Sequence, residues 1–290
     1  MFQAGNIKTQ PELPLDKFGS REFIQALLNS IAYRRGVGDL LAEGCARAAD
    51  HLKNGWEFCS KYFPAYGAAR HESVRDYPGV ALLWALDSRD PIIDHHPYFY
   101  LSVKYQDYPD PFRLSRKDAR AISRKILGSD MAIDHSTYEY KPEAVVYMQN
   151  RSAVINILVV CDWVYPIIQS QTTEDRMGDT SLESQLLAAV TGHHLAEKEL
   201  DQVGEKVWNL SRAFMAREGR TREEDTLHQS YFRERDGEKA IPKSDFERAK
   251  TRYYQLRGWD EKRGWPTKEK LERLGLSDIA DDLRKENLLK

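Results

Sequence analysis

Apolar residues recur every three or four positions along much of the chain, which is the spacing of one face of an α-helix. The clearest case is the segment 196–216, whose apolar stripe is formed by Leu200, Val203, Val207, Leu210 and Phe214. This spacing predicts a long helix that buries the stripe. A second helix is expected over residues 39–52, with Asp39 as its N-terminal cap. Gly44 inside it either permits the close approach of a neighbour or is a tolerated glycine.

Capping residues mark the ends of further predicted helices. Ser115 precedes the helical pattern "RKDARAISRKILG", and Thr267 precedes "KEKLERLGL", which Gly275 would end in a left-handed conformation. The chain has no long Val/Ile/Thr-rich alternation that would indicate a strand, and no glycine-rich phosphate loop. The predicted fold class is therefore all-α and multihelical.

The region 55–112 departs from this helical pattern. Its segments "GWEFCSKYFPAYGAARHESVRDYPG" and "DSRDPIIDHHPYFY" are rich in Pro, Gly, Tyr and His. Long loops inside a compact protein are usually functional or disordered, and the many aromatic residues here disfavour disorder. We therefore look for candidate chemistry in this region, where Arg89 precedes the pair His95 and His96.

Composition and charge exclude several classes of protein. The net charge is −2 with mixed signs, so nothing indicates a surface for nucleic acid or anionic membranes. The longest apolar run, "AVINILVVCDWVYPII", is broken by Asn156 and Asp162 and is shorter than the ~18 apolar residues typical of a membrane span. The amino terminus has no secretory signal pattern. Three scattered cysteines form no disulfide framework, and we expect a reducing, cytoplasmic setting.

Four ordered segments resemble the tungsten-containing aldehyde ferredoxin oxidoreductase family. They are "GVGDLLAEGCARAADHL", "FPAYGAAR", "VWNLSRAFMAREGRTREEDTL" and "YYQLRGWDEKRGWPTKEKLERLGL". The resemblance covers the C-terminal portion of that family only. It implies that residues 1–80 are the remainder of the family's middle helical domain, that residues 81–290 are its C-terminal helical domain, and that the β-rich N-terminal domain is absent.

The segment 156–161, "NILVVC", resembles the family's second pterin motif, Asp-x-x-Gly-Leu-Cys. The resemblance implies that Cys161 is the fourth ligand of a [4Fe-4S] cluster and that Asn156 stands where an aspartate contacts the pterin. Val159 and Val160 replace the motif's Gly-Leu pair. The alternative is that Cys161 is an ordinary core thiol. The ligand hypothesis predicts that Cys161 lies at the end of a buried helix, with its side chain at a surface.

The loop with the histidine pair resembles the family region "SNRGACH", whose histidine faces the tungsten site. We favour His96 over His95 as the corresponding catalytic residue, and we expect Arg89 to help bind the cofactor. A pair of histidines that merely organises turns is the alternative. A separate metal site at His194 and Glu197, which are three residues apart, is a weaker hypothesis because no second such pair is seen.

The resemblance implies that an aldehyde and water give a carboxylic acid, with electrons passed to ferredoxin. The implied cofactors are a tungsten-bis-pterin, or its molybdenum equivalent, and a [4Fe-4S] cluster, both of which need residues outside this chain. The implied partners are a separate N-terminal half or subunit, ferredoxin and the aldehyde, without nucleic acid or membrane; a homo-oligomer is left open. The alternative function is that of a non-catalytic helical partner subunit or truncated remnant.

Overall fold

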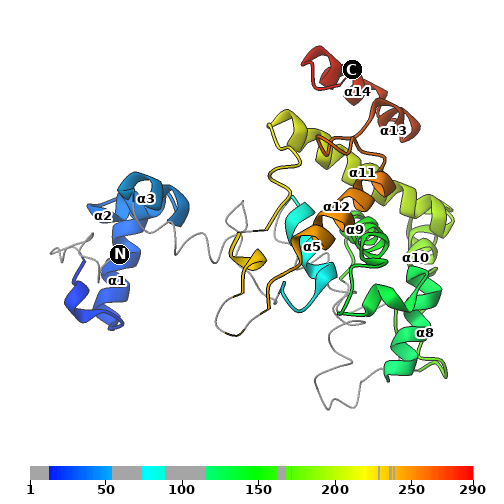
Figure 1. Cartoon of the computed structure of the whole chain (residues 1–290), viewed down its shortest axis with the longest axis horizontal. Coiled ribbons are helices and arrows are strands. Elements are labelled where there is room, and N and C mark those ends of the chain that lie inside the picture. The colour runs from blue at the N-terminus through cyan, green and yellow to red at the C-terminus, as the bar shows by residue number, and fades with distance from the viewer. Residues whose placement is uncertain are drawn as a thin grey trace. The chain divides into compact units, whose positions relative to one another are not determined.

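The computed structural model describes residues 13–53, 74–88, 115–161, 168–170, 172–227, 229–234, 237 and 239–289. The chain divides into two compact units, Met1–Ala69 and Arg70–Lys290. Figure 1 shows that both units are built from helices. Within the described residues, β pairing is limited to two isolated bridges, Gln169 with Met177 and Trp259 with Pro266. The all-α prediction is confirmed.

Within its described residues, 13–53, the first unit contains one 3-10 turn and three helices: η1 (Leu15–Lys17), α1 (Arg21–Ala32), α2 (Val37–Ala42) and α3 (Cys45–Leu52). Leu13, Leu15 and Phe23 form its small buried cluster. The single helix expected over residues 39–52 is wrong, because Gly44 takes a φ of 85° and separates α2 from α3. A right-handed helix cannot pass through that backbone conformation, which glycine adopts without steric cost.

The second unit contains eight α-helices and two 3-10 turns within the described residues. They are α5 (Pro78–Leu86), α8 (Arg116–Leu127), η2 (Asp130–Ile133), α9 (Lys141–Leu158), α10 (Leu182–Thr191), α11 (Glu197–Arg217), η3 (Gln229–Phe232), α12 (Lys243–Arg257), α13 (Lys268–Arg273) and α14 (Ser277–Lys285). No helix in these stretches is long and apolar enough to cross a membrane.

Helix α9 lies at the centre of the second unit. It contacts α5, α8, α10, α11 and α12, which surround it in Figure 1. Helix α5 packs against it with every residue buried. Two buried side-chain oxygens of α9 have hydrogen-bond partners on α12, as buried polar groups generally do. Gln149 Oε1 accepts a hydrogen bond from the Tyr253 hydroxyl at 2.6 Å, and Asn150 Oδ1 accepts one from Arg257 Nη1 at 2.5 Å.

Helix α11 buries a different face from the one that its apolar stripe predicts. Leu200 is buried, but Leu210 and Phe214 are exposed by 42% and 55%. The buried side follows a spacing of four residues along the helix: Leu200, Gly204, Trp208, Arg212 and Ala216. The apolar spacing predicted the wrong buried face because two of the buried positions are Gly204 and Arg212. The burial of these two residues depends on partners elsewhere in the chain.

Gly204 allows the backbones of α9 and α11 to touch. A Cβ atom at this position would lie 2.2 Å from the carbonyl oxygen of Asn150. The contact is with main-chain atoms of a buried helix, so it cannot be relieved by a side-chain rotation. The close crossing also places the Trp208 indole N–H against the carbonyl oxygen of Gln149, to which it donates a hydrogen bond.

We expect Gly204→Ala to lower the free energy of unfolding by about 2 kcal/mol or more, because α9 and α11 must separate to admit the methyl group. Urea denaturation followed by circular dichroism measures this. Gln202→Ala, on the exposed side of the same helix, is the matched control and should change stability by less than about 0.5 kcal/mol. Equal effects of the two substitutions would contradict the close crossing.

Candidate cofactor site at the end of helix α9

Helix α9 changes from buried to exposed at its C-terminal end. Its residues from Ser152 to Ile155 are buried, whereas Asn156 and Ile157 are exposed. The segment that resembles the pterin motif therefore begins where the helix leaves the core. Its first residue, Asn156, presents its side chain to the surface.

Val159 ends the helix in a left-handed conformation, with φ 56° and ψ 37°. The next amide closes the turn, since Val160 N donates to the carbonyl oxygen of Ile155 at 3.1 Å. Helices commonly end in this way, with glycine at the left-handed position. Val159 occupies the position of the motif's glycine and keeps a backbone conformation that is unfavourable for a β-branched residue.

The turn at Val159 determines where the thiol of Cys161 lies. If α9 continued as a helix, Cys161 would follow Val154 by seven residues and share its buried face. The chain instead leaves the helix, and Cys161 is an exposed, free cysteine. This placement agrees with the predicted position of the thiol, beyond the end of a buried helix. Its role as a cluster ligand stays a prediction.

We expect Val159→Gly to raise the free energy of unfolding by up to about 1 kcal/mol. The left-handed conformation costs a non-glycine residue roughly 1–2 kcal/mol, and part of that gain is offset by the greater entropy of glycine in the unfolded chain. Val190→Gly is the control, because Val190 is an equally exposed valine inside the right-handed helix α10. It should lower stability by about 0.5 kcal/mol, so a loss of stability in both variants would argue against the left-handed turn.

The other predicted site residues lie outside the described part of the chain. These are His95, His96 and Arg89, and their roles stay predictions. The described residues contain no group of three or more His, Cys, Asp or Glu side chains that could hold a metal ion. That includes the neighbourhood of His194 and Glu197. Of the proposed ligands of the cluster and the pterin, the described residues contain only Cys161 and Asn156.

The sequence contained no sign of the residues that hold the C-terminal end of α5. Arg220 donates hydrogen bonds to the carbonyl oxygens of Ala85 and Asp87, at 2.9 Å and 2.6 Å, at the end of α5. Arg220 is in turn paired with Asp225 at 2.8 Å. The sequence around them, "RAFMAREGRTREED", is so dense in charge that it resembles a solvated surface, and no local pattern distinguishes its buried members.

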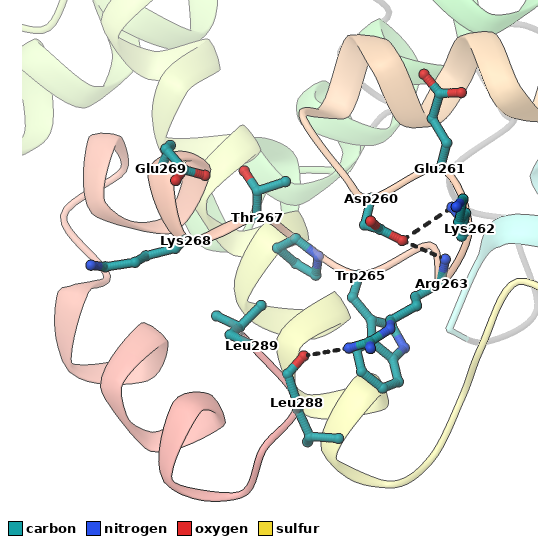
Figure 2. A pocket seen from close by; sticks show the side chains of 11 residues that line it. Asp260, Glu261, Lys262, Arg263, Trp265, Thr267, Lys268, Glu269, Leu288 and Leu289 are labelled. Atoms are coloured by element: carbon teal, nitrogen blue, oxygen red, sulfur yellow. Dashed lines mark hydrogen bonds between the residues drawn. The ribbon is translucent and has the colours of Figure 1, made fainter.

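A pocket of about 610 Å³ lies elsewhere, between the loop that follows α12 and the C-terminal residues (Figure 2). Arg263 spans it, stacking on the Trp265 ring at 5.0 Å and donating to the carbonyl oxygen of Leu288 at 3.3 Å. Its charged lining residues balance: Asp260, Glu261 and Glu269 against Lys262, Arg263 and Lys268. None of the predicted site residues lines this pocket, and its balanced charge favours no class of ligand.

The chain is similar to a known protein family and to several known proteins. A family model described as aldehyde ferredoxin oxidoreductase, domains 2 and 3, matches residues 1–276. The tungsten-containing aldehyde ferredoxin oxidoreductases of Pyrococcus horikoshii and Pyrococcus furiosus are 29% and 26% identical to it, each over 96% of this chain and 41% of their own length. The chain thus spans about two fifths of these curated relatives.

A solved structure has the same fold. It is described as the active site complex BamBC of benzoyl coenzyme A reductase with 1,5-dienoyl-CoA, and it matches all of this chain and 44% of its own with a TM-score of 0.70 and 20% identity. At that identity the likeness concerns the fold. The family model covers nearly the whole sequence, and the chain therefore belongs to the aldehyde ferredoxin oxidoreductase family.

Proposed function

We propose that the chain forms the C-terminal helical part of a tungsten- or molybdenum-pterin, iron-sulfur aldehyde oxidoreductase. The assembled protein would convert an aldehyde and water into a carboxylic acid and pass the electrons to ferredoxin. Family membership and the names of the curated relatives support this proposal. Because the chain spans 41% of those relatives, the remaining cofactor ligands would come from sequence that corresponds to the rest of their length.

The observation that carries the proposal is the exposed thiol of Cys161, just beyond a helix that is buried up to Ile155. As a thiolate it would donate one of the four ligands of a [4Fe-4S] cluster. Asn156, exposed at the start of the same turn, would hydrogen-bond a pterin through its amide. When bound, the metal-pterin and the cluster supply the redox chemistry, while the protein binds and orients them.

The proposed catalytic residue is His96, with His95 as the alternative, and Arg89 is a proposed cofactor ligand. A neutral imidazole next to the reacting aldehyde would accept the proton that is released when an aldehyde hydrate is oxidised. Arg89 would donate hydrogen bonds to an anionic group of the cofactor. These roles come from the family resemblance of the loop, which lies outside the described residues.

A non-catalytic helical partner subunit is the second candidate, and the substitutions in the motif favour it. Asn156 replaces a carboxylate, and the side chain of Val159, 88% exposed, stands where a glycine would leave the backbone open to a cofactor. A protein that has lost the cofactor could keep the fold and its association with the rest of the assembly.

Anaerobic purification from the native source, followed by metal analysis, tests the proposal. We expect tungsten or molybdenum together with iron, and aldehyde-dependent reduction of ferredoxin or a viologen dye. The recombinant chain alone should retain far fewer than about four irons after reconstitution and desalting, because one positioned thiolate cannot replace four. A native complex without either metal and without this activity would favour the non-catalytic subunit.

A further inference from the structure

A second pocket, of about 380 Å³, lies where α9, α10 and α11 meet in the second unit. Helix α9 provides one wall, and the first turns of α10 and α11 provide the other two. Its volume is within the range of sites for small ligands. Its lining contains none of the residues that we assign to the proposed cofactor site.

The charged residues that line this pocket are mainly acidic: Glu143, Glu183, Glu197 and Asp201 against Arg151 and Lys198. Arg151 and Glu183 are both buried and form an ion pair at 3.1 Å, so their charges compensate each other. Asp201 is half-buried and accepts a hydrogen bond from the amide of Asn150 at 3.2 Å. Within the described residues, no Lys, Arg or His side chain lies within ion-pair distance of Asp201. Burial raises the pKa of this carboxyl, although the hydrogen bond from Asn150 opposes the shift.

Hydroxyl groups add hydrogen-bonding capacity that the described protein does not use. The Oγ atom of Ser184 is shielded from solvent and has no hydrogen-bond partner among the described residues. A buried polar atom without a partner costs free energy, and a bound polar molecule would recover it. Tyr147 lines the same pocket, and burial raises its pKa to about 12, so its hydroxyl stays protonated at neutral pH.

Apolar side chains complete the lining. Val146, Val154 and Leu200 line the pocket beside the ring of Tyr147. A short alkyl chain would lie against these groups, and an ammonium group would meet the carboxylate of Asp201. Aromatic rings also attract cations through their faces. From this combination we propose that the pocket binds a primary ammonium group carried on a short alkyl chain.

The ammonium group has two sources that share this chemistry, a free small amine and the lysine side chain of a protein partner. The competing explanation is purely structural. Acidic residues in the first turn of a helix compensate its dipole, as Glu183 and Glu197 do for α10 and α11. Asp201 also faces the buried Arg257 across Asn150 and has Glu205 on its own helix. That explanation predicts no saturable amine binding.

Isothermal titration of the full 290-residue chain with n-butylamine at neutral pH tests the proposal. Butylammonium should bind saturably with one site, at least about tenfold more tightly than 1-butanol or butyrate, because only the cation pairs with Asp201. Asp201→Asn should weaken binding by at least about tenfold. Glu218→Gln, which removes an exposed carboxylate at the other end of α11, should bind like the wild type.

Ser184→Leu provides a test that keeps the carboxylate. It should reduce amine binding by filling the pocket from α10, with an unchanged circular dichroism spectrum. Equal affinity for butylammonium and 1-butanol, or wild-type binding by folded Asp201→Asn, would overturn the proposal. The source is identified with Nα-acetyl-lysine methylamide: tighter binding than butylamine indicates a protein lysine, and weaker binding indicates a free amine.

Discussion

Asp225→Ala should lower the free energy of unfolding by about 3–5 kcal/mol, which is the expected cost of removing one partner from a buried network of charges. Asp225 is fully buried, and so is Arg212, which holds it through two hydrogen bonds of 2.9 Å and 2.5 Å. Arg220 pairs with the same carboxylate at 2.8 Å, and the Tyr254 hydroxyl donates to it. Alanine would leave two buried guanidinium groups without their anion.

The loss should be large because the network joins distant parts of the second unit. Besides pairing with Asp225, Arg212 donates from Nε to the carbonyl oxygen of Gly264 at 2.6 Å, and Arg220 holds the end of α5. Removing the carboxylate therefore loosens α5, α11 and the loop after α12 together. Chemical denaturation with two spectroscopic probes measures the effect and shows whether the unit still unfolds in one transition.

Asp245→Ala is the matched control for Asp225→Ala. Asp245 also pairs with an arginine, Arg248, but both of these side chains are exposed. Exposed ion pairs contribute about 0–1 kcal/mol, so this variant should stay close to the wild type. A small loss for Asp225→Ala, similar to that of the control, would mean that the buried network contributes little to stability.

Local sequence signals predicted several helix ends, although the predicted cap at Asp39 is wrong, because Asp39 lies inside α2 and Gly36 precedes that helix. Ser115 caps α8 in a capping box with Asp118, and Thr267 accepts a hydrogen bond from Lys270 N at 3.2 Å. Gly275 takes the expected left-handed conformation, with φ 68°. These features could be predicted because the residues that form each cap are three or four positions apart, so their chemistry is contained in a short stretch of sequence.

Features that depend on distant contacts could not be predicted from periodicity. The inward face of α11 is determined by the crossing at Gly204 and by partners of Arg212 that lie 13 and 52 residues away. Arginine and glycine on a helix usually indicate solvent or flexibility, so the apolar stripe seemed the better candidate for the core. The helix break at Gly44 was missed for a similar reason. A glycine inside a helix and a glycine at a helix boundary cannot be distinguished from the local sequence.

At the candidate site, too, part of the structure could be predicted from the sequence and part could not. The family resemblance and the apolar run before Cys161 together indicated that the thiol lies at the end of a buried helix, and the structure agrees. The left-handed turn at Val159 was not predicted, because valine is among the residues least suited to it. The proposed division of the chain at residue 80 and the roles of His95, His96 and Arg89 remain predictions.

Cys161→Ala in the assembled protein should reduce bound iron and lower electron transfer to ferredoxin by more than about tenfold. The proposed cluster needs four thiolates, and the loss of a ligand is expected to exceed the 10- to 100-fold effects of changes to neighbouring groups. Folding should be unaffected, because Cys161 is exposed and contributes no core contact. Iron analysis, the visible absorption of the cluster and ferredoxin reduction measure the effect on the same preparation.

Two control variants separate a ligand role from a general effect of losing a thiol. Cys45→Ala removes the other exposed cysteine of the described residues, which matches no ligand position, and should keep full iron and activity. Cys161→Ser keeps the size of the side chain but replaces the soft sulfur ligand, so it should resemble Cys161→Ala. If both Cys161 variants retained wild-type iron and ferredoxin reduction, the thiol would not be a cluster ligand. The non-catalytic subunit would then account better for the departures at Asn156 and Val159, because the turn would present Cys161 to a neighbouring protein surface rather than to a cofactor.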